Sequence, residues 1–392
     1  MISESKRFYV VDALRGFAII SIMLLHNIEH FDFYYVPENI PQWMAAIDQG
    51  IWDTMFFLFG GKSYAMFALL FGLTFYIQMH NQEKRGEDFR PRFAWRMFLL
   101  LIFGIINSAF FQGDILSIYA VLGVLLIPVA RLNDKAVFVI ALILFLQPYE
   151  MVRLFMAIQN PDMQLSDPTS WAYFGKMGEY AGGESLLATI KGNLTNGKVA
   201  VLLWNWENGR YFHILALFMF GMLAGRRKLF AWNSENKRFW IKALIISAVA
   251  FIPLFAIQSS TGSLIESEAI RRSFTIIQSS WTNLCFMVIL LSGFVVLFHS
   301  KRMQKALNIF TPIGKMSLSN YVFQSIVGAT IYYGFGFGLY QHANTTPAFL
   351  IGLVLAVITW FGCNWWAGQY KRGPLETIWH KATWFNSEKR HH

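Results

Sequence analysis

Apolar stretches long enough to cross the roughly 30 Å hydrocarbon layer of a membrane as helices recur along this 392-residue chain. Hydrophobic residues make up 55% of the chain and charged residues only 14%, a balance typical of proteins built for lipid. The sequence therefore predicts an all-α polytopic membrane protein with about ten transmembrane helices, in which residues 1–392 form a single integral membrane domain. The stretches lie near residues 10–28, 51–79, 95–111, 115–131, 136–157, 211–225, 239–257, 281–299, 316–340 and 347–370.

Basic residues gather on alternate connections between these stretches. By the positive-inside rule, such connections face the cytoplasm. The connection at 28–49 contrasts with them, because it contains acidic residues but no Lys or Arg. Both termini are therefore predicted to be cytoplasmic. The basic connections contain Lys6 and Arg7, residues 84–96, Arg131 with Lys135, residues 226–228, residues 301–305, and Lys371 with Arg372.

The net charge of +10 is spread over these short clusters and forms no continuous basic face. This pattern indicates membrane topology, and we expect membrane lipid, not nucleic acid, as a partner. Cys285 and Cys363 both lie inside apolar stretches, which argues against a disulfide framework or a cysteine zinc site.

Two segments depart from simple crossings. The stretch at 51–79 is interrupted by Gly60, Gly61 and Lys62, which indicates two half-helices or a re-entrant element. The connection at 158–210, between the fifth and sixth predicted helices, is long and rich in aromatic residues. It is interpreted as an external loop or cap.

The helix at 10–29 carries the most informative polar residues. Asp12 and Arg15 lie near its start, and His26 follows ten uncharged residues later. Eleven steps of about 1.5 Å place Arg15 and His26 roughly 16 Å apart along the axis. Ionisable groups inside a bilayer are costly and usually functional. His26 is a candidate general base and Arg15 a candidate ligand for an anionic headgroup or phosphate.

Structural roles would also explain these residues. Arg15 could serve as an interfacial anchor, and His26 as a core histidine bonded to a neighbouring helix. His26, Glu29 and His30 also spell H-x-x-E-H, a spacing found in inverted zincins. A hydrolytic zinc site would need a further acidic ligand from elsewhere, and we expect no bound metal.

Asp114 follows Gly113 in a very short turn between two predicted helices. A helix N-cap accounts for this position, because free N–H groups there favour a carboxylate. If Asp114 reaches across to His26, it would orient the imidazole and support it as a catalytic residue. Lys62 is a further buried charge, and Glu150 with Arg153 has the spacing of a helical ion pair.

Six motifs are spread over nearly the whole chain. They are VDALRGFAII at 11–20, FALLFGLTF at 67–75, GDILSIYAVLG at 113–123, GKMSLSNYVFQS at 314–325, YGFGFGL at 333–339 and GPLETIWHKATW at 373–384. In their sequence, order and spacing, these motifs together resemble the YeiB-like family of bacterial inner-membrane proteins of unassigned function.

The YeiB-like family is similar to a broader group of transmembrane acyltransferases, including acyltransferase family 3 and the lysosomal heparan acetyltransferase. Arg15, ten residues and His26 match a motif of acyltransferase family 3. The resemblance implies transfer of an acyl group from cytoplasmic acetyl-CoA or another acyl-CoA to a hydroxyl acceptor. His26 would be the base and Arg15 would face the donor phosphates. A second motif of two arginines corresponds imperfectly to Arg92 and Arg96, which have three residues between them instead of two.

The leading hypothesis is thus an inner-membrane acyltransferase with His26 and Asp114 as catalytic residues and a glycan or lipid-linked acceptor. The donor would be bound by Arg15 with Arg92 or Arg96, and Lys62 is a further candidate for donor binding. A transporter or flippase would use the same buried residues as a pathway. A zinc-dependent intramembrane hydrolase is the third reading.

Overall fold

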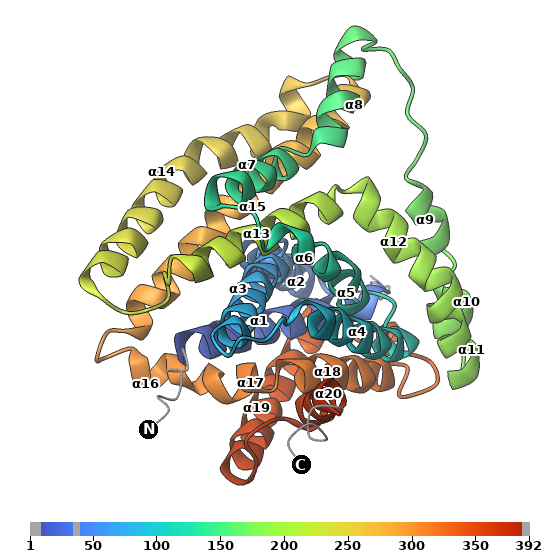
Figure 1. The fold of residues 1–392 in the computed structure, drawn as a ribbon. Coiled ribbons are helices and arrows are strands. Elements are labelled where there is room, and N and C mark those ends of the chain that lie inside the picture. The colour runs from blue at the N-terminus through green and yellow to red at the C-terminus, as the bar shows by residue number, and fades with distance from the viewer. Residues whose placement is uncertain (1–8, 34–39, 386–392) are drawn as a thin grey trace.

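A computed structural model describes residues 9–33 and 40–385, and every regular element within these ranges is helical (Figure 1). Lys6 and Arg7, which entered the topology prediction, lie outside the described residues, as do residues 34–39 of the connection at 28–49. The helices are α1 Tyr9–Ile28, α2 Gln42–Phe59, α3 Ser63–Glu83, α4 Arg90–Phe110, α5 Leu116–Val124, α6 Leu126–Val129, α7 Asp134–Phe145, α8 Pro148–Gln159, α9 Thr169–Phe174, α10 Met177–Ala181, α11 Leu186–Gly192, α12 Lys198–Glu207, α13 Arg210–Arg226, α14 Ser234–Leu264, α15 Glu268–Phe298, α16 Gln304–Leu307, α17 Thr311–Lys315, α18 Ser317–Tyr332, α19 Thr345–Gln369 and α20 Pro374–Trp384.

The chain is an all-α, multi-pass membrane protein. In the described part, six helical segments are long and apolar enough to cross a membrane, and the bent pair α7 and α8 raises this number to seven. The six are α1, the consecutive α2 and α3, α4, α14, α15 and α19.

Several predicted stretches form helices that are short for a straight crossing. α13 and α18 contain 17 and 16 residues, which extend about 26 and 24 Å against roughly 30 Å of hydrocarbon. The stretch at 115–131 is divided between α5 and α6. The count of ten therefore remains a prediction that includes these shorter helices as crossings.

The interruption predicted at Gly60–Lys62 is present. α2 ends at Phe59 and α3 begins at Ser63, and Gly61 between them has a φ of 75°. This left-handed backbone conformation suits glycine, because adopting it costs conformational free energy for residues that carry a Cβ. Each half is long enough on its own to reach most of the way through a bilayer.

The segment at 158–210 is largely helical, and α9 to α12 form an arm along one edge of the molecule (Figure 1). Its attachment uses backbone contacts: the Gly334 N–H donates to the Ala181 carbonyl at 2.9 Å. A Cβ on Gly334 would lie 2.1 Å from the Gly182 carbonyl oxygen, so glycine permits this approach. The external position of the arm remains a prediction.

The centre of the molecule contains α1 and α3, with α13 packed directly on α3 (Figure 1). Glycines let the last two helices touch through their backbones. A Cβ on Gly72 would lie 1.8 Å from the Phe218 carbonyl oxygen, and one on Gly221 would lie 1.8 Å from that of Leu69. Such distances exclude any side chain unless the helices separate.

The change Gly72→Ala is therefore expected to lower the thermal midpoint of the detergent-solubilised protein by several degrees. Forcing a methyl group into a packed contact costs about 1–3 kcal/mol. Gly362→Ala in α19 is the matched control, because a Cβ there meets no atom within 4 Å. Equal midpoints for the two variants would contradict the proposed α3–α13 contact.

Candidate functional site

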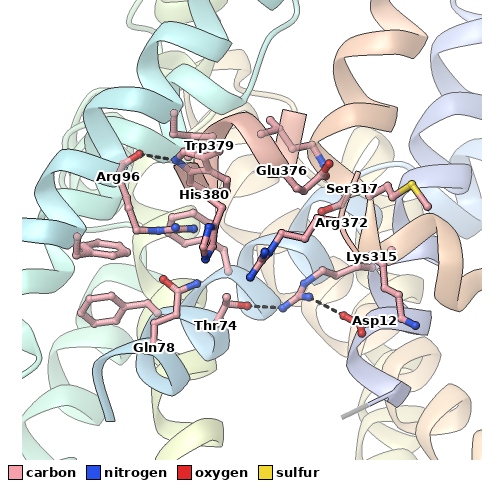
Figure 2. Close-up of a pocket in the computed structure, with 18 of the residues that line it drawn as sticks. Asp12, Thr74, Gln78, Arg96, Lys315, Ser317, Arg372, Glu376, Trp379 and His380 are labelled. Carbon is pink, nitrogen blue, oxygen red and sulfur yellow. Dashed lines mark hydrogen bonds and ion pairs between the residues drawn. The ribbon is translucent and has the colours of Figure 1, made fainter. Parts of the chain in front are cut away.

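A cavity of about 780 Å³ opens at the end of the bundle where the α3–α4, α17–α18 and α19–α20 connections meet. Arg15 of α1 lies in its wall. Figure 2 shows Asp12 and Thr74, two residues that contact it. The Arg15 Nη1 is 3.0 Å from Asp12 Oδ1, and its Nη2 donates to Thr74 Oγ1. The Asp12–Arg15 pairing expected from their spacing is present, and α3 holds the guanidinium in place.

Cations outnumber acids in the lining of this cavity. Among the described residues of the lining, the acids are Asp12, which pairs with Arg15, and Glu376, which accepts hydrogen bonds from the start of α18. A concave surface with excess charge of one sign focuses its potential and attracts ligands of the opposite sign. The cavity is therefore suited to an anion. The cations that line it are Arg15, Arg85, Arg96, Lys315, Lys371 and Arg372.

The Glu376 carboxylate closes the N-terminus of α18. Its Oε1 accepts hydrogen bonds from the backbone N–H groups of Leu318 at 2.8 Å and Ser319 at 3.1 Å, and its Oε2 accepts the Ser319 hydroxyl proton. Burial raises the pKa of Glu376, whereas these hydrogen bonds act to lower it. Glu376 thus fixes α20 against α18 and lines the cavity at the same time.

Arg92 and Arg96 of α4 hold α20 from the other side. The Arg92 guanidinium lies 4.2 Å from the ring centre of Trp384, and that of Arg96 lies 4.1 Å from that of Trp379. Such stacking stabilises both groups. Arg96 lines the cavity, whereas Arg92 instead donates to the Thr383 carbonyl at 2.9 Å outside it.

His26 lies at the opposite end of α1 and outside the cavity lining. Its Nδ1 is 3.1 Å from Glu29 Oε2, and its ring packs edge-on against Phe111 at 4.8 Å between centroids. A carboxylate at Nδ1 favours a proton on that nitrogen and leaves Nε2 as the basic one. The His26 side chain is 20% exposed, so its ring can be reached from outside the protein.

Asp114 is fully buried and caps α5. It accepts the backbone N–H groups of Leu116 at 3.1 Å and Ser117 at 3.0 Å, as the N-cap interpretation expects. Asn107 donates to it at 3.1 Å, and Lys198 of α12 pairs with it at 3.3 Å. Over the described ranges, no hydrogen bond joins Asp114 to His26.

Lys62 contacts neither His26 nor the lining of the cavity. Its Nζ donates to the Phe56 carbonyl at 3.3 Å and lies 5.7 Å from the Phe286 ring centre. It belongs to the break between α2 and α3 and is not among the lining residues of the cavity, of which Phe67 is the first in α3. The predicted ion pair of Glu150 and Arg153 is present at 3.2 Å.

The H-x-x-E-H pattern brings His26 and Glu29 together as a pair. Among the residues that the structure describes, no group of three His, Cys, Asp or Glu side chains is arranged to hold a metal ion.

Sequence reasoning did not single out several polar groups in the cavity wall, among them Thr74, Lys315, Glu376 and His380. Arg372 was noted only as a topology signal. These residues come from α3, from the end of α17 and from the stretch at 372–380, and only the fold brings them together. The available signals were the motifs of the resemblance, because Thr74 lies in FALLFGLTF, Lys315 in GKMSLSNYVFQS and His380 in GPLETIWHKATW.

Comparisons with known proteins agree with the resemblance to YeiB. Residues 224–386 match the family described as "Protein of unknown function (DUF418)". The chain is 26% identical to the uncharacterized protein YxaH of Bacillus subtilis, covering 97% of this chain and 95% of the relative. It is 24% identical to the uncharacterized protein YeiB of Escherichia coli, covering 96% of each. No solved structure matches the chain.

The pair of half-buried Lys198 with fully buried Asp114 gives a stability prediction. Lys198→Met should lower the thermal midpoint by several degrees, because a carboxylate left in a buried site costs on the order of 3 kcal/mol. Lys191→Met, which removes an exposed cation of the same arm, is the control. Adding Asp114→Asn to Lys198→Met should restore part of the loss, whereas an unchanged midpoint for Lys198→Met would show that the pair contributes nothing.

Proposed function

We propose that this member of the DUF418 family is an inner-membrane acyltransferase that transfers an acyl group from a cytoplasmic acyl-CoA to a hydroxyl acceptor. The observation that carries the proposal is the cation-rich cavity with Arg15 in its wall and His26 on the same helix. In this proposal the chain crosses the membrane about ten times, with both termini and the cavity mouth in the cytoplasm. The basic connections around the cavity support this orientation.

The cavity would bind the phosphates of the donor. Guanidinium groups suit phosphate because they donate two parallel hydrogen bonds to its oxygens. Arg15 is held by Asp12 and Thr74, which orients it before a ligand arrives. Arg96 is fixed by a different contact, because its guanidinium stacks on the Trp379 ring. In this proposal Arg92 holds α20 in place, and Lys62 supports the break between α2 and α3.

The donor must also reach His26. About 16 Å of α1 separates Arg15 from His26, so the ligand needs a long neutral arm between its phosphates and its reactive carbonyl. An acyl-CoA has this form, since a pantetheine chain connects its phosphates to the thioester. The arm would follow α1 from the cavity towards the other half of the membrane.

His26 would then activate the acceptor. Its Nε2 accepts the hydroxyl proton while the acceptor oxygen bonds to the thioester carbonyl carbon. The carbon–sulfur bond then breaks, and the CoA thiolate takes the proton from the imidazolium. Glu29 at Nδ1 stabilises that cation. Asp114 would act indirectly, because it fixes the turn after Phe111 and Phe111 packs against His26.

The acceptor would approach from the outer side, where a glycan or lipid-linked sugar of the cell envelope presents hydroxyl groups. The arm formed by α9 to α12 would lie over this side in the predicted topology.

A transporter or flippase is the second candidate. It is favoured by buried charges away from the cavity, namely Lys62 and the Lys198–Asp114 pair, because such groups can line a pathway. An assay in proteoliposomes that contain the protein, with labelled acyl-CoA and envelope extract, distinguishes transfer from transport. Release of free CoA with labelling of the extract supports transfer, whereas uptake of intact ligand supports transport.

Binding tests the donor site directly. We expect acetyl-CoA to raise the thermal midpoint of the purified protein in a saturable manner. Arg15→Ala should weaken binding roughly 10- to 100-fold, as expected for loss of a charge-assisted hydrogen bond. Lys381→Ala, on the exposed side of α20, is the control and should bind normally. Folded protein that binds no acyl-CoA would refute the donor assignment.

His26 is tested by transfer. His26→Ala should bind acetyl-CoA like the unchanged chain, because His26 lies outside the cavity lining. Acyl transfer should fall about 10²- to 10⁴-fold, the usual contribution of a general base. Full transfer by His26→Ala would exclude His26 as the base while leaving the donor site intact.

A further inference from the structure

A second cavity, of about 740 Å³, shares no lining residue with the proposed donor site. It lies where the start of α1 meets α16, the α13–α14 connection and the end of α15 (Figure 1). α1, α14 and α15 are each long and apolar enough to cross a membrane. Because one end of each of these helices is at or next to the second cavity, the cavity lies at the level where the chain leaves the bilayer.

The second cavity has an apolar floor and a cationic rim. Val10, Phe230 and Phe298 form the floor and are only 3–4% exposed. Lys301 and Lys305 form the rim and are exposed to solvent. A lipid with a negatively charged headgroup matches this arrangement, because its apolar part would cover the floor while its charge meets the lysines.

Acidic side chains are missing from this lining. None of its described residues is Asp or Glu, and neither lysine pairs with a carboxylate within residues 9–33 and 40–385. The sequence contains no Asp or Glu between His299 and Glu376. The two ammonium groups therefore attract an anion without competition from carboxylates of the same lining.

An aromatic wall of the second cavity is held in place by its own contacts. The Trp232 ring stacks on the His299 ring with 3.9 Å between centroids and 7° between the planes. His299 Nδ1 is 2.9 Å from the Val295 carbonyl oxygen, which ties this pair to the last turn of α15. Trp232 and Tyr9 remain 40% and 55% exposed, as is usual for aromatic residues at the level of lipid headgroups.

We propose that the second cavity binds the headgroup of an anionic phospholipid, with Lys301 and Lys305 contacting its charge. The glycerol and the first carbons of the acyl chains would lie against the apolar floor, beside Trp232. A free phosphate ion would satisfy the lysines but would leave this floor uncovered. The site would face the cytoplasmic leaflet in the predicted topology. The proposal goes beyond acyl transfer and does not depend on it.

Native mass spectrometry of the delipidated, detergent-purified full chain tests the proposal. The chain is titrated with phosphatidylglycerol or with phosphatidylethanolamine of identical acyl chains. The first lipid bound should show a preference for phosphatidylglycerol of about 10- to 30-fold, as expected for two lysines near an anionic headgroup. Lys301→Gln combined with Lys305→Gln should remove this preference. Both lysines are exposed, so the fold should persist, and an unchanged thermal midpoint without lipid checks this.

Two further double variants separate a defined site from a general effect of surface charge. Lys237→Gln with Lys242→Gln removes two exposed cations from the start of α14, outside the lining, and should keep the preference. Lys301→Arg with Lys305→Arg retains the charge at the rim and should keep it as well.

Three outcomes would overturn the proposal. The first is equal affinity of the unchanged protein for the two lipids. The second is a preference that survives Lys301→Gln with Lys305→Gln, or that is lost equally in the α14 control. The third is displacement of the lipid by an equal concentration of glycerol 3-phosphate, which would indicate a site for a small free anion. Binding of acyl-CoA at Arg15 is measured separately, so none of these results decides the donor proposal.

Discussion

Close backbone contact around α1 is the constraint on which the site depends. A Cβ on Gly16 would lie 2.0 Å from the Phe310 carbonyl oxygen, and one on Gly314 would lie 1.7 Å from that of Asp12. Only hydrogen fits at these positions, so α1 and α17 approach until their backbones touch. Dispersion contacts without intervening side chains give this type of association its stability in a membrane. Asp12 and Arg15 are thereby held beside Lys315 at the cavity.

The same close packing leaves little space for water, so buried polar groups must satisfy one another. Asp114 does so with donors from α4, α5 and α12, and Lys198 brings charge from the edge arm into the bundle. Glu376 similarly joins α20 to α18. These carboxylates connect peripheral helices to the core, which explains why segments far apart in the chain meet at defined positions.

Much of this arrangement could be predicted from the sequence. Hydropathy indicates the helices, since each apolar stretch must satisfy its own backbone in lipid. The break at Gly60–Lys62 and the pairing of Asp12 with Arg15 follow from local chemistry. Crossing numbers are harder to predict, because α13 is apolar whether it faces lipid or is enclosed by neighbours. Asp114 illustrates the limit: its turn indicated a helix cap, but no local signal pointed to Lys198, 84 residues later.

The cavity could not be recognised from sequence for a related reason. Lys371 and Arg372 follow a predicted crossing, where the positive-inside rule already explains basic residues. Their position beside Arg96 depends on α20 folding back onto α4, and this is set by arginine–tryptophan stacking and the Glu376 cap. Once α20 is in place, residues that orient the chain in the membrane also line a site. The same positive charges therefore serve both membrane topology and ligand binding. The binding role can be recognised only from the fold, which brings these charges together in the wall of one cavity.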